Sequence, residues 1–132
     1  MGSLERLLKL LLQYTSYLDG LNADDLSDVY KYLSAVYLLQ VQALIDIAVK
    51  AAAALGLGVE GYIDAGNKLK SAGILSDEEF RRYRTVVRFR NIVVHQYDIE
   101  IIRRIIERRE YRDVARMGIK IVEEVRRRTR KN

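Results

Sequence analysis

The segment NADDLSDVYKYLSAVYLLQVQALIDIAVKAAAALGLG, residues 22–58, decides the fold of this 132-residue chain. From Leu26 to Ala48 its apolar side chains recur at intervals of three and four residues, which is the spacing of one face of an α-helix. Asn22 stands before an acidic pair, as an N-cap would, and the final GLG ends the pattern. The segment therefore predicts one unusually long helix that begins near Asn22 and ends near Ala54.

The rest of the chain shows the same helical spacing, and the whole sequence contains no proline. Ser76 is followed three residues later by Glu79, a capping box that predicts the start of a helix. These patterns predict a single all-α domain over residues 1–132. Besides the long helix, helical segments are expected from about Ser3 to Asp19, from Glu60 to Ala72, from Ser76 onward and from Tyr111 to Arg128. A further helical segment is expected after Asp98, which would be its N-cap.

The composition limits the kinds of site that one chain can build. There is no cysteine and only one histidine, His95, so disulfides, thiolate metal sites and multi-histidine metal sites are excluded within a single chain. Arg6, Lys9 and Lys50 interrupt the apolar runs, so we expect neither a signal peptide nor a membrane span. The net charge of +5 includes a basic C-terminal end at 126–132. A solvated helix end is favoured there over an anionic partner.

The only histidine lies in the sequence RFRNIVVHQY, residues 88–97. Arg90 and His95 are five residues apart, which is roughly 140° around a regular helix, so ideal helix geometry does not bring them together. Three routes could: a distorted helix end, the reach of the long arginine side chain, or a second copy of the helix across a symmetric interface. Taken alone, an arginine and a histidine at this spacing are more often structural or surface residues.

The run RNIVVHQY, residues 90–97, resembles the R-x4-H-x-Y motif of HepT-like proteins in the HEPN superfamily. The similarity extends over most of residues 25–107, where a long helix, a tyrosine-led short helix and the motif helix follow in the family's order. One difference is Gly61, because the family often has proline before the position of Tyr62. The resemblance implies a HEPN-type up-and-down bundle of about five helices that forms a homodimer.

The resemblance also implies a function. HepT-like proteins are toxins of two-gene toxin–antitoxin pairs and act as metal-independent endoribonucleases on RNA, with tRNA a possible substrate class. The partner would be a small MNT-type nucleotidyltransferase antitoxin, which transfers AMP from ATP to the motif tyrosine. That tyrosine corresponds to Tyr97 here. For this chain we accordingly expect a cytoplasmic location, no cofactor and no metal.

The chemistry can be argued from the residues themselves. In RNA cleavage without a metal the 2′-hydroxyl attacks the adjacent phosphorus, so one group must accept its proton and another must protonate the leaving 5′ oxygen. Imidazole suits both tasks because its unperturbed pKa is about 6.5. One His95 cannot be base and acid at the same instant, which argues for a two-fold dimer that supplies two His95 and two Arg90 side chains.

Two further residues are candidates for supporting positions. Asn91 would orient the imidazole or the phosphate, with a helix-surface amide as an equal alternative. Asp46 lies in the long helix where HepT-like sequences often have an acidic residue. It would either reach the site or form a surface ion pair.

Two alternatives to a ribonuclease are open. One is a HEPN domain without catalytic activity that binds nucleotide or nucleic acid, or that pairs with a nucleotidyltransferase. The other is a helical interaction module in which Arg90 and His95 are incidental. The intact arginine, histidine and tyrosine set favours the ribonuclease. Tyrosines such as Tyr30, Tyr37 and Tyr83 are expected in the core or an interface rather than stacked on bases. Arg81, Arg82, Arg84 and Arg88 precede the motif on the same helix and include candidates for contact with an RNA backbone.

Overall fold

The structure is a computed structural model that describes residues 2–20, 29–95 and 99–130. Those residues form only helices, without any strand, which confirms the all-α prediction. The six helices are α1 (Gly2–Asp19), α2 (Val29–Ala54), α3 (Tyr62–Ser71), α4 (Asp77–His95), α5 (Ile99–Glu107) and α6 (Tyr111–Thr129).

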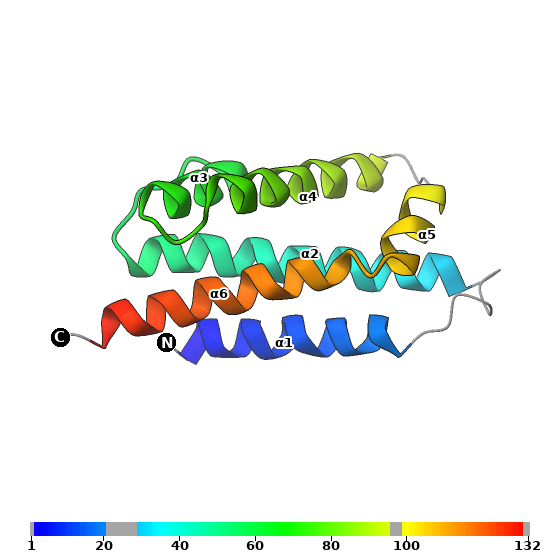
Figure 1. Cartoon of the computed structure of the whole chain (residues 1–132), viewed down its shortest axis with the longest axis horizontal. Helices are drawn as coiled ribbons and strands as arrows, with labels where there is room; N and C mark the ends of the chain where they lie inside the picture. Colours follow the sequence, from blue (N-terminus) through cyan, green and yellow to red (C-terminus); the bar gives the residue numbers. More distant parts are fainter. Residues whose placement is uncertain (1, 21–28, 96–98, 131–132) are drawn as a thin grey trace.

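The four long helices form an up-and-down bundle (Figure 1). Helix α2 runs antiparallel to α1, α4 antiparallel to α2, and α6 antiparallel to α4, so both termini lie at the same end of the bundle (Figure 1). The short helix α3 packs against α2 and α4, while α5 turns the chain at the opposite end. This arrangement carries the end of α4, with the motif, to the end of the bundle where α5 lies.

Most predicted helix ends agree with the structure to within one or two residues. Helix α2 ends at Ala54, as expected, because Gly56 has a φ of 74°. The predicted capping box is present: the Ser76 amide donates to Glu79 Oε1 at 2.9 Å, and the Glu79 amide donates to Ser76 Oγ at 3.1 Å. The predicted caps Asn22 and Asp98 lie outside the described residues.

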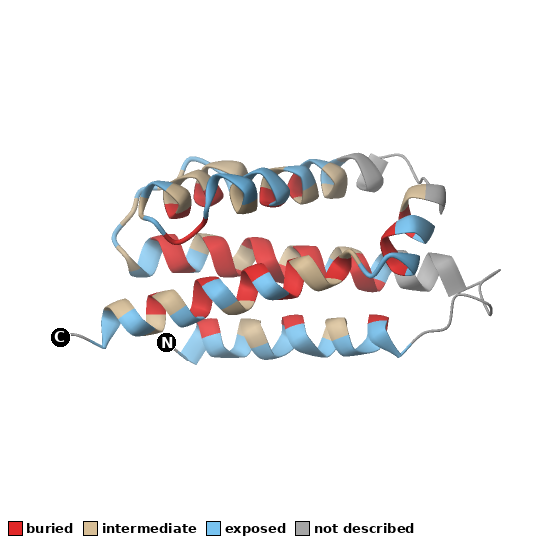
Figure 2. Cartoon of the chain, viewed as in Figure 1, coloured by how far each residue is buried: buried red, intermediate tan, exposed pale blue. Residues whose placement is uncertain are grey.

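Helix α2 is the centre of the core. Residues such as Val41, Leu44 and Ile45 are fully buried, and α1, α3, α4 and α6 all pack against this helix (Figure 2). Residues 35–54 are long and apolar enough to cross a membrane by length and composition alone, but 61% of the apolar window is buried inside the bundle. Burial of that kind is typical of a core helix.

The predicted location of the tyrosines holds where the structure describes them. Tyr37 and Tyr83 are buried in the core, whereas the side chain of Tyr30 lies outside the described part of the chain. Burial is the main cause that raises the pKa of both buried tyrosines. Neither ring is therefore available to stack on a base.

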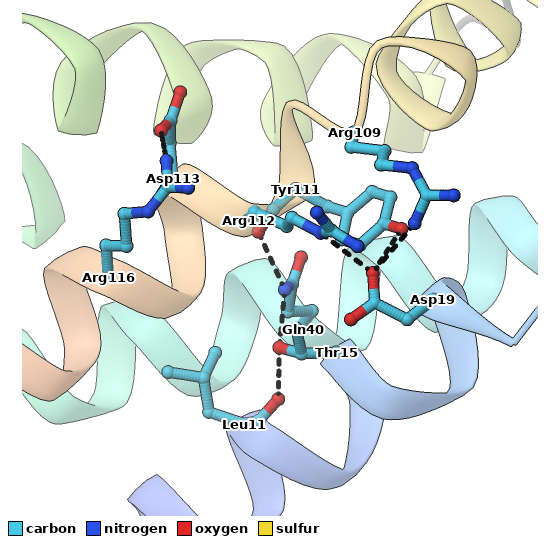
Figure 3. Close-up of polar contacts among 9 residues, drawn as sticks. All are labelled: Leu11, Thr15, Asp19, Gln40, Arg109, Tyr111, Arg112, Asp113 and Arg116. Atoms are coloured by element: carbon cyan, nitrogen blue, oxygen red, sulfur yellow. Dashed lines mark hydrogen bonds and ion pairs between the residues drawn. The ribbon is translucent and has the colours of Figure 1, made fainter.

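A buried polar side chain joins three of the long helices (Figure 3). Gln40 of α2 donates from Nε2 to Thr15 Oγ1 of α1 at 2.9 Å and to the Tyr111 carbonyl of α6 at 3.0 Å. Thr15 Oγ1 in turn donates to the Leu11 carbonyl at 2.8 Å. Because buried hydrogen bonds depend on direction, this chain of contacts fixes the relative register of α1, α2 and α6.

Candidate active site

Arg90 lies on the side of α4 that faces the bundle. Tyr83 and Val87, seven and three residues earlier, are buried on the same side of the helix, and the arginine itself is half-buried. Its Nη1 donates to Asn91 Oδ1 at 3.3 Å. The structure thus brings two of the predicted site residues together, and it leaves Asn91 exposed.

The pairing of α4 with α2 shows what lies opposite Arg90. The rings of Tyr37 and Phe89 are in contact, with centroids 6.0 Å apart, and the Asp46 carboxylate acts electrostatically on Tyr83. Because the two helices are antiparallel, a step of seven residues forward from Tyr83 corresponds to seven residues backward from Asp46. By the two contacts together, Arg90 lies at the level of residues 36–39 of α2, a stretch that ends at Leu39, whose apolar side chain is 49% exposed.

His95 is the last residue of α4. The helix is α-helical without interruption as far as this residue, so the backbone keeps the separation of roughly 140° between positions 90 and 95. A distorted helix end, one of the three routes considered above, is absent over this stretch. The reach of the arginine and a second copy of the helix are the two routes left. The side chain of His95 and the whole of Tyr97 lie outside the described part of the chain.

Asp46 lies away from Arg90 within one chain. It is half-exposed, its Oδ1 accepts a 3.0 Å hydrogen bond from Gln42 Nε2, and it lies beside Tyr83, roughly 10 Å before Arg90 along α4. No hydrogen bond or ion pair joins Asp46 to Arg90 in the structure as described. The hydroxyl of Tyr83 donates instead to the Tyr62 carbonyl at 2.6 Å.

A groove of about 460 Å³ lies between α4 and the α5–α6 segment, on a side of α4 next to the one with Arg84 and Arg88. Apolar side chains, including Val86, Phe89 and Ile105, line it together with charges of both signs. Arg82 is paired there with Glu78 at 2.9 Å and lies 3.9 Å from Asp113. The groove arises because α4 touches α6 only lightly, a long-range feature without a local signal in the sequence.

The described residues include no group of three or more histidine, cysteine, aspartate or glutamate side chains placed to hold a metal ion. The exposed Leu39 of α2, in the stretch at the level of Arg90, is a feature that the sequence did not predict. Its position depends on how α2 pairs with α4, which no local pattern reveals.

Comparison with known protein families gives a match over most of the chain. The family described as "Ribonuclease HepT-like" matches residues 5–121, which is most of the chain and includes the R-x4-H-x-Y run. Neither a curated protein nor a solved structure matches this chain.

Proposed function

Since this chain belongs to the HepT-like ribonuclease family, we propose that it is a metal-independent endoribonuclease whose site is built from Arg90 and His95. The observation that carries the proposal is the complete R-x4-H-x-Y run of the sequence, which begins within α4 and lies inside the segment that matches the family. The substrate is RNA, because the reaction requires a 2′-hydroxyl as nucleophile.

The proposed reaction is an internal transesterification. One His95 accepts the proton of the 2′-hydroxyl, the 2′ oxygen bonds to phosphorus, and the bond from phosphorus to the 5′ oxygen breaks. A second His95 in its protonated form donates a proton to that leaving oxygen. The products are a 2′,3′-cyclic phosphate and a free 5′-hydroxyl. The guanidinium of Arg90 stabilises the negative charge that develops on the phosphate oxygens.

This scheme requires a homodimer with the two motif helices close together. Two features of the single chain support it. Helix α4 keeps positions 90 and 95 on different sides of one helix, and Leu39 of α2 leaves an apolar side chain exposed within the stretch that lies at the level of Arg90. A second copy would cover Leu39 and bring its own arginine and histidine to the same place.

We further propose that the protein is the toxin of a toxin–antitoxin pair. Its partner would be an MNT-type nucleotidyltransferase that transfers AMP to Tyr97, two residues after His95. Asn91, which accepts a hydrogen bond from Arg90, would hold the guanidinium in position for the phosphate. Asp46 would act only indirectly, through α2, because it lies beside Tyr83.

RNA cleavage by the purified protein in the presence of EDTA tests the proposal. The wild type should release a 2′,3′-cyclic phosphate, and His95→Ala should lose at least about 100-fold in rate, the contribution typical of a general acid or base. A matched RNA with a single 2′-deoxy sugar at the cut site should resist cleavage. Equal cleavage of the two substrates would exclude attack by the 2′-hydroxyl. Binding of RNA without cleavage by the wild type would favour the non-catalytic HEPN alternative.

A further inference from the structure

We propose that one face of α4, carrying Arg84 and Arg88, binds the RNA backbone and leads it to His95. The proposal rests on the ribonuclease function proposed above and extends it to the part of the substrate outside the cut site. We call this face the α4 basic stripe and define it by Arg84 and Arg88, together with Lys70 and Phe80 at its beginning.

The helical register aligns the stripe with the motif. Positions 84, 88, 91 and 95 follow at intervals of four, three and four residues, so they lie within roughly 60° of one another around a regular helix. Arg88 and Asn91 are exposed, and Arg84 is half-buried. Helix α4 turns its exposed residues away from α2, as Figure 2 shows. The stripe thus runs along the open side of α4 for roughly 16 Å and ends at the position of His95.

The stripe has positive charge from Arg84, Arg88 and Lys70. In the described ranges no carboxylate pairs with Arg84 or Arg88, although Arg82 on another side of α4 is paired with Glu78 and Asp113. The acidic residues of α4 occupy its first turn, at the end distant from His95. Unpaired cations in a row along one helix face attract a chain of phosphates.

A second element adds to the same charge. The Nζ of Lys70 on α3 lies 5.0 Å from the centre of the Phe80 ring, and the Arg84 guanidinium lies 5.8 Å from it. Two cations from two helices are therefore gathered at one half-buried ring. Such an arrangement holds the positively charged ends in place without a carboxylate, so they stay free to meet phosphate oxygens.

In two other basic regions, the C-terminal run and the groove beside α4, carboxylates lie among the arginines. In the C-terminal run Arg126 is paired with Glu5, and Arg127 and Arg128 are both paired with Glu124. The groove beside α4 contains carboxylates among its arginines. Of these three basic regions, only the stripe combines unpaired positive charge with alignment toward the motif.

The stripe has a consequence for the substrate. Its length corresponds to roughly five nucleotides of a stacked single strand at about 3.4 Å each. The contacts would be to phosphates and therefore independent of base sequence. Efficient cleavage should accordingly need several nucleotides on one side of the cut, and a dinucleotide should be a poor substrate that gains nothing from the stripe.

Binding and cleavage are measured separately to test this. A 12-nucleotide single-stranded RNA with 2′-O-methyl groups, which cannot be cut, reports affinity by fluorescence anisotropy at several salt concentrations. The variant is Arg84→Gln/Arg88→Gln. The matched control is Arg82→Gln, which removes one arginine from a different side of the same helix. Circular dichroism melts establish that each protein is folded.

The double variant should bind on the order of tenfold more weakly, and the slope of log affinity against log salt should fall by about 1.4, because each phosphate contact on a single strand contributes about 0.7. Its KM for a long RNA should rise with kcat retained, and its cleavage of a dinucleotide should equal that of the wild type. If the double variant keeps the RNA affinity and the salt slope of the wild type, or if Arg82→Gln loses as much RNA affinity as the double variant does, the proposed role of the stripe is wrong. If the wild type binds RNA through Arg84 and Arg88 but does not cut it, the proposed ribonuclease function is refuted and the proposed role of the stripe in RNA binding is not.

Discussion

The hydroxyl of Tyr111 donates a 2.6 Å hydrogen bond to Oδ1 of Asp19, which joins the start of α6 to the end of α1 (Figure 3). Arg112 Nε donates to the same oxygen at 2.9 Å, and Arg109 Nη1 lies 3.6 Å from it. Arg109 has a φ of 55° and lies in the turn between α5 and α6. The Asp19 carboxylate therefore anchors the turn between α5 and α6. Helix α5 is the helix that follows the motif in the sequence.

Tyr111→Phe should lower the free energy of unfolding by about 1 kcal/mol at pH 7, the usual net value of one hydrogen bond. The ring is buried and would keep its packing, so only the bond to Asp19 is lost. This bond, followed by Arg112 and Arg109, lowers the pKa of Asp19 against the opposing effect of burial. The measurement is urea denaturation followed by circular dichroism.

The pH dependence of this loss identifies the carboxylate as the cause. A lowered folded-state pKa means that the contribution is present above the unfolded value of about 3.9 and is lost as the pH falls below it. The difference between wild type and Tyr111→Phe should therefore shrink as the pH falls from 5 toward 3. Tyr17→Phe, an exposed tyrosine on α1, should match the wild type throughout. A difference that stays constant with pH would rule out Asp19 as the partner that matters.

Gly66→Ala should destabilise the fold by about 1–3 kcal/mol, the usual cost of overpacking. Gly66 is in the interior of α3, where alanine would gain about 1 kcal/mol in helix propensity, but a Cβ atom there would overlap the edge of the Tyr83 ring. That ring is fully buried and is held by the bond from its hydroxyl to the Tyr62 carbonyl. Urea denaturation measures the change.

Gly58→Ala is the matched control for this substitution. A Cβ at Gly58 would meet nothing within 4 Å, so the free energy of unfolding should change by less than about 0.5 kcal/mol. A neutral or stabilising Gly66→Ala would show that α3 can move away from α4 at little cost.

The features of the fold that could be predicted from the sequence are the local ones. The helical spacing of α2 and the capping box at Ser76 depend on residues a few positions apart, and both are present in the structure. The neighbours of Arg90 could not be predicted in this way. The contact of Tyr37 with Phe89, and the exposure of Leu39 at the level of Arg90, follow from the pairing of two antiparallel helices joined through α3. The pairing of His95 and Arg90 from two chains stays a prediction.

Mixing wild-type subunits with His95→Ala subunits should reveal a shared site. If both imidazoles of a dimer are needed for one cleavage, a mixed dimer is inactive, and activity should fall with the square of the wild-type fraction. At one wild-type subunit in four, roughly one sixteenth of the activity should remain, against one quarter for independent sites. Co-refolding at constant total protein, followed by cleavage assays, gives the curve.

A variant at Leu39 tests the same dimer by another route. Leu39→Lys would place a charge at an exposed apolar position of α2 near the level of Arg90, so it should shift the protein toward monomer in sedimentation experiments and reduce cleavage with it. Leu12→Lys on α1 is a comparable exposed position and should leave the dimer intact. An active monomer would end the proposal of a composite site.

The last prediction concerns Tyr97, which follows His95 by two residues and Arg90 by seven. In the proposed modification its oxygen attacks the α-phosphorus of ATP and pyrophosphate leaves, so a negatively charged and bulky AMP group is added next to the motif. That charge would compete with the RNA phosphate for Arg90 by the electrostatics that phosphorylation uses, and modification should therefore abolish cleavage. Tyr97→Phe removes only the hydroxyl and should retain most of the nuclease activity.

Incubation with an MNT-type nucleotidyltransferase and ATP, followed by mass spectrometry and RNA cleavage assays, tests both parts. The wild type should gain mass in units of AMP and lose activity in proportion, whereas Tyr97→Phe should gain none and stay active. Tyr62→Phe, which removes a tyrosine that is 46% exposed, controls for non-specific transfer and should be modified like the wild type. AMP mapped to another residue, or full cleavage by protein completely modified at Tyr97, would show that this hydroxyl does not control the site.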